Sequence, residues 1–344
     1  MDSVRRVDFP SGTPARVVVD GLRAWLGAPG EPEPLVVETS GSTGVPKRVL
    51  LSRRAVLASV AATERRLDGS GPWLLAVPPT YVAGVQVICR SLTAGHEPVL
   101  VDGSVAEAVE RAGATAFLSL VPTQLHRLLD QPESVGALRD VHTILLGGGP
   151  IDPSLRGRAE DEGLRVVATY GSAETAGGCV YDGWPLDGVE VEVEADGRIR
   201  LAGPTLFDGY DNDRELTAQV LVDGWFRTND AGRLDREGRL HVLGRIDDVV
   251  VSGGVNVPLP AVAARLRAHP DVATAEVVGV PDPEWGQRVV AFVVAAAPVS
   301  LEELRDWVAD EHPRAWAPRE VVAVDALPML ANGKVDRLAL EELA

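Results

Sequence analysis

The sequence predicts an α/β fold in two domains. A large N-terminal domain has mainly parallel strands flanked by helices plus a β-rich subdomain, and a small α+β domain follows it. The 344 residues are 45% hydrophobic and 24% charged, which suits a folded chain of about two domains. From about residue 98 apolar runs alternate with helical stretches, which favours a parallel sheet. After residue 185 shorter apolar runs are separated by turn signals, which favours antiparallel strands.

The large domain is expected to begin with a strand at 35–37, after a loop rich in Gly and Pro at 27–34. Ser104 and Glu107 have the spacing of a capping box, and Pro122 suits the first turn of a helix. The alternation then predicts strands at 99–101, 116–120, 143–146 and 164–169, with helices at 104–112 and 122–130 and a polar helix before the last strand. Ligands of such sheets bind in the loops at the carboxyl ends of strands, and Gly147-Gly148-Gly149-Pro150 is such a loop.

Turn dipeptides mark the β-rich subdomain, whereas patterns of helices and strands mark the small domain. Turns are predicted at Asp187-Gly188, Asp196-Gly197, Asp208-Gly209 and Asp223-Gly224. Past Gly244 the pattern predicts a helix at 258–268, strands at 272–280 and 289–295, and a helix from Ser300 to about Glu311 with a capping box to Glu303. The expected domains are therefore residues 1–244 and 245–344.

Charge and cysteine content exclude several classes of protein. Fifty acidic side chains oppose 33 basic ones, and a formal charge of -17 argues against a general binder of nucleic acid or of membrane surfaces. Cys89 and Cys179 form neither a disulfide framework nor a metal-binding spacing. Without an apolar signal core or a membrane span, a cytoplasmic enzyme without stable membrane association is expected. The sequence defines no subunit interface, and it is compatible with a homo-oligomer.

The loop after the first strand has the chemistry of a polyphosphate site. Residues 40–44 are Ser, Gly, Ser, Thr and Gly, and Lys47 follows. Glycines let the backbone approach a ligand closely, and hydroxyl and N–H groups donate to phosphate oxygens. The spacing does not fit a Walker A loop, which needs Gly-Lys-Ser/Thr. A flexible turn without a ligand would have the same composition.

The segment Thr39 to Lys47 resembles the phosphate-binding signature of the adenylate-forming superfamily, which includes acyl-CoA synthetases. Further motifs follow in the order of that family. The resemblance implies that ATP is bound by Thr39, Ser40, Gly41, Ser42, Thr43, Gly44, Lys47, Gly148, Gly149, Pro150, Tyr170, Gly171, Asp230 and Arg245. Tyr170 would stack on adenine, and Asp230 would accept hydrogen bonds from the ribose.

The resemblance also implies the catalytic groups and the movement of the small domain. Glu174 would hold Mg²⁺, and Lys334 in Asn332-Gly333-Lys334 would neutralise the charge that develops as the acid attacks the α-phosphate. Thr43 would be the third catalytic residue. Asp247 would be the hinge of a mobile small domain. The family usually has a hydroxyl where Ala173 stands. Because few residues precede the phosphate loop, the N-terminal subdomain is expected to be truncated.

The acid-binding segment 77–92 resembles that of the o-succinylbenzoate–CoA ligases of menaquinone biosynthesis. The resemblance assigns the acid to Tyr81, Arg90, Ala173, Gly177 and Gly178, with Tyr81 where the family commonly has His. That acid is an aromatic dicarboxylate, and Arg90 would receive the carboxylate that does not react. A structural ion pair between Arg90 and an acidic residue is the alternative, because a buried charge needs a partner.

The expected reaction is the ATP-dependent ligation of 2-succinylbenzoate to CoA through an acyl-adenylate, with Mg²⁺ as cofactor. An adenylating enzyme that loads another aryl or acyl acid onto CoA or onto a carrier protein is one alternative. A non-catalytic adenylate-binding relative is the other, and Ala173 favours it. Retention of Lys334, Glu174 and Asp230 argues against that second alternative.

Overall fold

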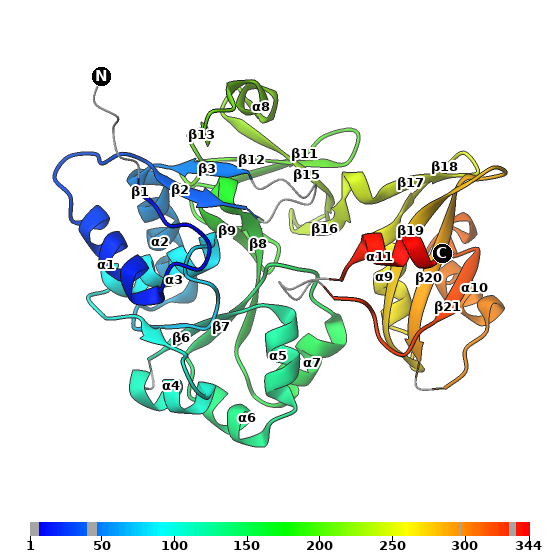
Figure 1. Cartoon of the computed structure of the whole chain (residues 1–344), viewed down its shortest axis with the longest axis horizontal. Coiled ribbons are helices and arrows are strands. Elements are labelled where there is room, and N and C mark those ends of the chain that lie inside the picture. Colours follow the sequence, from blue (N-terminus) through cyan, green and yellow to red (C-terminus); the bar gives the residue numbers. More distant parts are fainter. Residues whose placement is uncertain (1–6, 40–46, 114, 296, 330–334) are drawn as a thin grey trace. The chain divides into compact units, whose positions relative to one another are not determined.

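The computed structural model of the chain describes residues 7–39, 47–113, 115–295, 297–329 and 335–344 (Figure 1). Contacts between backbones divide the chain into two compact units. The first comprises Met1–Glu192, Arg200–Thr228 and Arg236–Leu240, and the second comprises Val193–Ile199, Asn229–Asp235 and His241–Ala344. The boundary predicted between residues 244 and 245 stays a prediction.

A seven-stranded sheet with the order β10-β9-β8-β7-β6-β4-β5 forms the centre of the first unit. Its strands are β4 (Trp73–Leu75), β5 (Val99–Leu100), β6 (Phe117–Leu120), β7 (Thr143–Leu146), β8 (Val166–Ser172), β9 (Gly177–Tyr181) and β10 (Trp184–Pro185). Strands β5, β4, β6, β7 and β8 pair in parallel, whereas β9 and β10 are antiparallel. The predicted, mainly parallel sheet is confirmed, together with its strands at 99–101, 116–120, 143–146 and 164–169.

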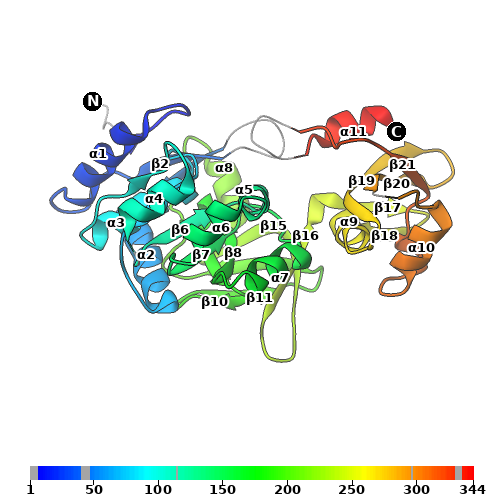
Figure 2. The same cartoon turned by 90° about the horizontal axis from the view of Figure 1, so that it is seen from below.

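Helices cover both faces of this sheet. On one face, α4 (Val105–Ala112), α5 (Pro122–Leu129), α6 (Pro132–Leu138) and α7 (Pro153–Asp161) share a buried core with Leu118, Leu120 and Ile144. Figure 2 shows α4, α5 and α6 in front of the strands of this sheet. Side chains alternate along a strand, so Phe117 lies on the other face, where it stacks on Trp73 with ring centroids 4.9 Å apart. There α3 (Val82–Thr93) packs on β4 and on α2 (Arg53–Leu67). The helices predicted at 104–112 and 122–130 are confirmed, and so is the first capping box.

A smaller sheet has the order β1-β2-β3-β13. It consists of β1 (Val7–Asp8), β2 (Leu35–Glu38), β3 (Arg48–Leu51) and β13 (Gly209–Tyr210), and α1 (Ala15–Leu26) follows β1 in the chain. Strands β2 and β3 are antiparallel, with Glu38 opposite Arg48. The strand predicted at 35–37 is confirmed. The predicted phosphate loop therefore connects two neighbouring strands.

The β-rich segment forms a sheet with the order β11-β12-β15-β14, and β16 pairs with β15. Its elements are β11 (Glu190–Val193), β12 (Arg198–Ala202), α8 (Arg214–Val220), β14 (Leu221–Val222), β15 (Trp225–Leu234) and β16 (Leu240–Arg245). Asp223 and Gly224 join β14 to β15 with φ angles of 50° and 81°, both positive as a type I′ turn requires. The turn predicted at Asp208-Gly209 is wrong. Gly209 begins β13 instead, because its backbone pairs with Leu50 of β3.

The second unit contains a sheet with the order β18-β17-β20-β19, and β21 pairs with β20. Its elements are β17 (Val249–Ser252), β18 (Val255–Pro258), α9 (Leu259–Arg267), β19 (Val272–Asp282), β20 (Gly286–Ala295), α10 (Leu301–Ala309), β21 (Glu320–Ala323) and α11 (Arg337–Leu343). Val277 and Val289 face α9 and α10, and Phe292 packs with Leu340 of α11. The predicted α+β character, both strands and both helices of this region are confirmed. Across the described residues, every helix is too short or too polar to cross a bilayer.

Candidate active site

Two predicted ligand-binding segments lie at the carboxyl ends of neighbouring parallel strands. Leu146, the last residue of β7, pairs with Ala168 of β8. Gly148, Gly149 and Pro150 follow β7, and Tyr170 lies two residues beyond Ala168. A Cβ atom on Gly147 would lie 2.3 Å from Thr169 Oγ1, so the two segments touch. The structure thus brings the glycine-rich loop and the tyrosine to the edge of the sheet where ligands bind.

A tight connection between β8 and β9 holds Glu174. The Thr175 hydroxyl accepts a hydrogen bond from the Ser172 N–H at 2.9 Å and donates to the Gly177 carbonyl at 2.7 Å. A Cβ atom on Gly171 would lie 2.2 Å from that same carbonyl oxygen, so only glycine fits there. Ala173 is buried in the same short turn, Ala173–Thr175. The tertiary fold therefore fixes the backbone of Glu174.

The carboxylate of Glu174 is buried and has a phenolic partner. Glu174 is 7% exposed, and its Oε1 accepts a hydrogen bond from Tyr210 Oη at 2.8 Å. Burial and the charge of Glu174 raise the pKa of Tyr210 well above its usual value, so the phenol stays protonated and donates. Sequence reasoning missed Tyr210. Its only sequence signal is an aromatic residue after Asp208-Gly209, which resembles an ordinary turn.

The ends of the phosphate loop are joined by hydrogen bonds. The Thr39 N–H donates to the Lys47 carbonyl at 2.9 Å, and the Lys47 N–H donates to Thr39 Oγ1 at 3.3 Å. The Thr39 hydroxyl is an acceptor here, which leaves its own proton for a ligand. Lys47 Nζ lies 5.4 Å from the centroid of the Tyr210 ring, within the range of a cation–π interaction. The predicted residues Ser40, Gly41, Ser42, Thr43 and Gly44 lie outside the described residues.

Glu174 fits the donor requirements of Mg²⁺. This cation prefers oxygen ligands and is usually bound through one or two carboxylates together with substrate phosphates. Within the part of the chain that the structure describes, Tyr210 is the hydrogen-bond partner of the carboxylate through Oε1, and Oε2 has none. Lys47, which lies over the Tyr210 ring, has the charge that suits the phosphates. Glu174 could therefore provide one ligand, and the phosphates of ATP would provide others.

The start of helix α3, which Tyr81 immediately precedes, packs beside this turn through Gln86. Tyr81 is the residue before the helix, and its carbonyl accepts from the Val85 N–H at 2.9 Å. One turn further, the buried Gln86 amide donates to the Ala176 carbonyl at 2.7 Å. A Cβ atom on Gly177 would lie 3.2 Å from Gln86 Cγ, so the helix packs directly against Gly177, and Gly178 follows in β9. Gln86 is a second residue that sequence reasoning missed.

Arg90 is buried at the far end of α3 from Tyr81. It is 6% exposed, and its Nη2 donates to Thr63 Oγ1 at 3.2 Å and to Tyr181 Oη at 3.3 Å. Its guanidinium carbon lies 4.8 Å from the ring centroid of Trp73, and its Nε has no hydrogen-bond partner among the described residues. The alternative of a structural ion pair finds no support, because no described carboxylate lies within 4.0 Å of Arg90. Arg90 is nine positions after Tyr81, about 13 Å along a helix, so the two side chains are not brought together.

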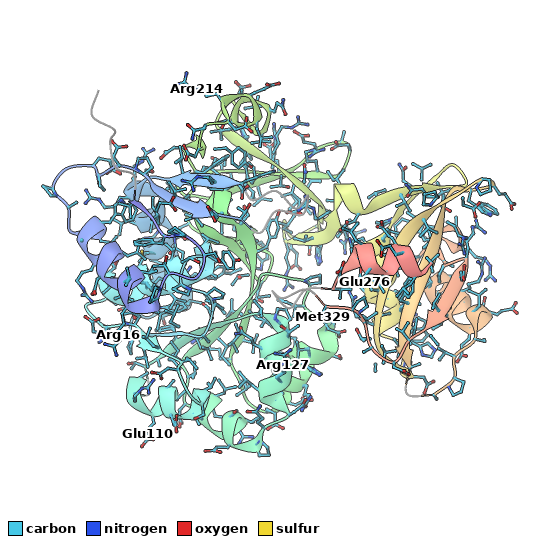
Figure 3. The ribbon with its side chains drawn as sticks, viewed as in Figure 1. Arg16, Glu110, Arg127, Arg214, Glu276 and Met329 are labelled. Atoms are coloured by element: carbon cyan, nitrogen blue, oxygen red, sulfur yellow. The ribbon has the colours of Figure 1, made fainter. Side chains whose placement is uncertain are left out.

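The remaining predicted residues belong to the second unit. Asp230 lies in β15, Arg245 ends β16, and Asp247 lies in the short turn Ile246–Asp248. At the end of this turn, Asp248 Oδ1 pairs with Arg337 Nη1 at 2.6 Å, and Arg337 also pairs with Glu276 at 2.8 Å (Figure 3 labels Glu276). Lys334 lies outside the described residues, three positions before Arg337.

Two other sets of potentially reactive side chains, the two cysteines and a histidine with two carboxylates, do not form a functional site. Burial raises the pKa of both Cys89 and Cys179 to about 12, so both remain thiols and neither serves as a nucleophile. His269, Asp271 and Glu303 lie close enough to suggest a cation site. However, the Asp271 N–H donates to His269 Nδ1 at 3.2 Å, which leaves the proton on Nε2. This imidazole therefore has no lone pair for a metal.

Comparison with known proteins places these residues in a family. A model described as AMP-binding enzyme matches residues 35–210, and one described as AMP-binding enzyme C-terminal domain matches residues 261–334. The chain is 43% identical over 320 residues to a protein of Mycobacterium tuberculosis (strain ATCC 25618 / H37Rv) called probable 2-succinylbenzoate–CoA ligase. That match covers 89% of this chain and 83% of the other. It is 30% identical over 327 residues to the 2-succinylbenzoate–CoA ligase of Enterococcus faecalis, with 87% and 67% covered.

Two solved structures are similar to this chain over most of its length. The o-succinylbenzoate CoA synthetase of Bacillus subtilis, in complex with the acyl-adenylate intermediate OSB-AMP, has a TM-score of 0.78 and 30% identity, and the match covers 89% of this chain and 68% of that one. The amide bond synthetase McbA of Marinactinospora thermotolerans has a TM-score of 0.80 and 31% identity, with 90% and 68% covered.

Proposed function

Because the chain belongs to the family of AMP-binding enzymes, we propose that it ligates 2-succinylbenzoate to CoA with ATP. The products are 2-succinylbenzoyl-CoA, AMP and diphosphate. The observation that carries the proposal is the group of Glu174, Tyr210 and Lys47 beside the phosphate loop, in a chain that is 43% identical to a probable ligase of this acid. The OSB-AMP bound to a relative of similar fold supports the same acid. The reaction consumes ATP and CoA, which supports a cytoplasmic location.

In the first half-reaction, a carboxylate oxygen of the acid attacks the α-phosphorus of ATP and diphosphate leaves. Lys47 and the loop 39–47 bind the phosphates, and Lys334 neutralises charge that develops at the α-phosphate. This is catalysis by placement and electrostatics, in which preorganised charges stabilise the transition state. Mg²⁺ held by Glu174 would neutralise phosphate charge. Tyr170 and the loop 148–150 hold the adenine, while Asp230 and Arg245 bind the rest of the nucleoside.

In the second half-reaction, the CoA sulfur attacks the acyl carbon of the adenylate and AMP leaves. The thiol proton goes to solvent or to the leaving phosphate. In our proposal the small domain, residues 245–344, turns about Asp247 between the two half-reactions. The same site thereby serves attack at phosphorus and then attack at carbon.

The choice of acid rests on α3 and the β8–β9 turn. Gly177 lies beside Gln86 of α3 and Gly178 follows it in β9, while Tyr81 immediately precedes the helix. Arg90 is the cation proposed to receive the second carboxylate. Its support is a buried guanidinium with no carboxylate among its described neighbours, which is costly unless an anion is bound.

ATP–diphosphate exchange with a panel of acids tests the proposal. The panel contains 2-succinylbenzoate, benzoate, succinate, a medium-chain fatty acid and several amino acids. We expect exchange with 2-succinylbenzoate alone. Arg90→Ala should raise the KM for that acid about 100-fold, because a charged hydrogen bond is lost. Arg16→Ala, at an exposed residue of α1, is the control and should leave the KM unchanged.

The other outcomes separate the alternatives. Exchange with a different acid would support the proposed adenylation chemistry and would contradict 2-succinylbenzoate as the substrate. Transfer from the adenylate to a holo carrier protein rather than to CoA would identify a carrier-loading enzyme. Absence of exchange with every acid, in a protein that binds ATP, would indicate a non-catalytic relative. A KM that Arg90→Ala leaves unchanged would make Arg90 a structural residue.

A further inference from the structure

One short segment is hydrogen-bonded to both parts of the candidate active site. The Phe207 N–H donates to the Glu174 carbonyl at 2.9 Å, at the β8–β9 turn. From there the chain continues along β3, where the Asp208 N–H donates to the Leu50 carbonyl at 2.9 Å and Tyr210 pairs with Val49. Val49 is two residues from Lys47. Tyr210 is therefore fixed between the turn of Glu174 and the end of the phosphate loop.

The Tyr210 side chain contacts both charged groups. Its hydroxyl donates to Glu174 Oε1 at 2.8 Å, and its ring lies 5.4 Å from Lys47 Nζ. Tyr210 is 6% exposed and Glu174 is 7% exposed, so the hydrogen bond between them is largely screened from water, whereas Lys47 is half-buried. No ion pair within 4.0 Å joins Lys47 to Glu174 in the described part of the chain. The tyrosine thus contacts a cation through its ring and an anion through its hydroxyl.

Separation of these two charges has a chemical consequence. At low dielectric, an ammonium and a carboxylate attract strongly and would pair directly if nothing lay between them. Such a pair would neutralise both groups before ATP binds. A phenol gives the carboxylate a hydrogen bond through its hydroxyl and gives the ammonium the negative face of its ring. Each charge is then stabilised while it stays available to a ligand.

We propose that Tyr210 is a positioning residue that keeps Lys47 and Glu174 apart and directs Lys47 to the phosphates of ATP and Glu174 to a divalent cation. The inference rests on the proposed function, because it takes ATP as the ligand. A purely structural role would need the ring alone. The ring already packs edge-on against Phe207 with centroids 5.1 Å apart, and phenylalanine would make that contact equally well.

Calorimetric titration of ATP, with EDTA and then with Mg²⁺, separates the two interactions. Tyr210→Phe keeps the ring and loses the hydroxyl, so the ATP affinity in EDTA should stay within about twofold of wild type. The gain in affinity on adding Mg²⁺ should fall about tenfold, because a charged hydrogen bond is removed. Tyr210→Leu removes the ring as well and should also weaken binding of ATP in EDTA.

The lysine content of the chain provides a second readout that does not depend on activity. Lys47 and Lys334 are the two lysines in the sequence. Selective ¹³C labelling of lysine therefore gives two sets of side-chain signals, which Lys47→Arg assigns. The Lys47 signals should be shifted upfield by the aromatic ring in wild type and in Tyr210→Phe. The shift should disappear in Tyr210→Leu.

Tyr181→Phe is the matched control for removing a buried phenolic hydroxyl. Tyr181 is 1% exposed, and its hydroxyl lies 3.0 Å from Thr63 Oγ1, in contact with Arg90 rather than Glu174. The Mg²⁺-dependent gain should be unchanged in this variant. A double-mutant cycle with Glu174→Gln adds a direct test, since Tyr210→Phe should have no further effect on the gain once the carboxylate is absent.

The outcomes separate this inference from the proposed function. A normal Mg²⁺-dependent gain in Tyr210→Phe, with only a lowered melting temperature, would overturn the positioning role. A wild-type protein that shows the gain and the lysine shift but exchanges diphosphate with no acid would overturn the proposed reaction alone. A wild-type protein that does not bind ATP would overturn both.

Discussion

At the scale of single residues, the arginines and the lysines of this chain have different roles. Of the 33 basic residues, 31 are arginines and two are lysines, because 33 less Lys47 and Lys334 leaves 31. Arginines make the structural ion pairs. Arg48, for example, binds Asp8 at 2.8 Å, Glu38 at 3.1 Å and Asp211 at 3.1 Å. A guanidinium fork suits several carboxylates, whereas an ammonium is a compact charge. Both lysines fall in the segments proposed to bind ATP.

His142 should make stability depend on pH. Its ring lies against Phe117 with centroids 4.7 Å apart, and its Nε2 lies 3.5 Å from Arg165 Nη1. Burial, and then the charge of Arg165, lower the pKa of His142 from 6.5, against a weaker opposing effect of Asp68. At low pH the unfolded chain therefore binds more protons than the folded chain. The contribution of His142 to the free energy of unfolding is complete above pH 6.5 and is lost as the pH falls through the lowered pKa of the folded state.

The measurement is the melting temperature between pH 5 and 7.5. We expect His142→Gln to lose part of the decrease below pH 6.5 that wild type shows. His312, whose pKa burial also lowers, should account for a remaining decrease. Equal slopes in the variant and in wild type would contradict this origin.

Local hydrogen bonds set where several helices begin, at the scale of the element. Ser104 and Ser300 each accept from the N–H of the residue three positions later, Glu107 and Glu303, at 3.1 and 3.2 Å. The glutamates bond back to the N–H of each serine. These bonds satisfy donors that a helix leaves free at its start. The helices α4 and α10 therefore begin where the sequence predicts.

Loss of one cap should destabilise its own unit. Ser300→Ala should lower the free energy of unfolding by about 1 kcal/mol, measured by urea denaturation of the full chain. Ser300→Asp, which also caps helices well, should restore most of it. Ser104→Ala provides the same change in the other unit and should affect a different part of the unfolding curve. An equal loss in the alanine and aspartate variants would show that the cap is not the cause.

Two units, each with its own hydrophobic core, make up the molecule as a whole. Leu118 and Ile144 belong to the core of the first, and Val277 and Val289 to that of the second. Lys47, Glu174 and Tyr210 belong to the first unit, whereas Asp230, Arg245 and Lys334 belong to the second. Our proposed mechanism needs groups from both. Catalysis is therefore expected to fail when either unit is impaired.

Lys334→Ala tests that dependence on the second unit. The loss of a charge that acts at the α-phosphate should lower ATP–diphosphate exchange by about 100-fold or more. ATP binding and the melting temperature of the first unit should change little. Lys334→Arg is the control for charge alone, and it should recover only part of the rate because its fork differs in shape. Exchange at the wild-type rate in Lys334→Ala would remove this lysine from the mechanism.

The sequence by itself determined the class of fold, and it predicts which loops bind the ligands. Apolar alternation predicted the strands β5 to β8, since burial on both faces requires apolar runs, and the capping boxes of Ser104 and Ser300 predicted two helix starts. The glycines at 147–149 and 171 could be singled out from the sequence, and at Gly147 and Gly171 close contacts leave no room for a side chain. These signals are local, so they can be read from neighbouring residues.

Only the tertiary structure decided which side chains meet. Tyr210 bonds Glu174 across 36 positions of the chain, and Arg90 reaches Thr63 and Tyr181 across 27 and 91 positions. No local pattern specifies such pairs, because they depend on which strands and helices pack together. For the same reason Asp208-Gly209, a turn by its residues, begins a strand, since β3 pairs with it. Local residue chemistry predicts elements and loops, whereas long-range packing selects the partners in the site.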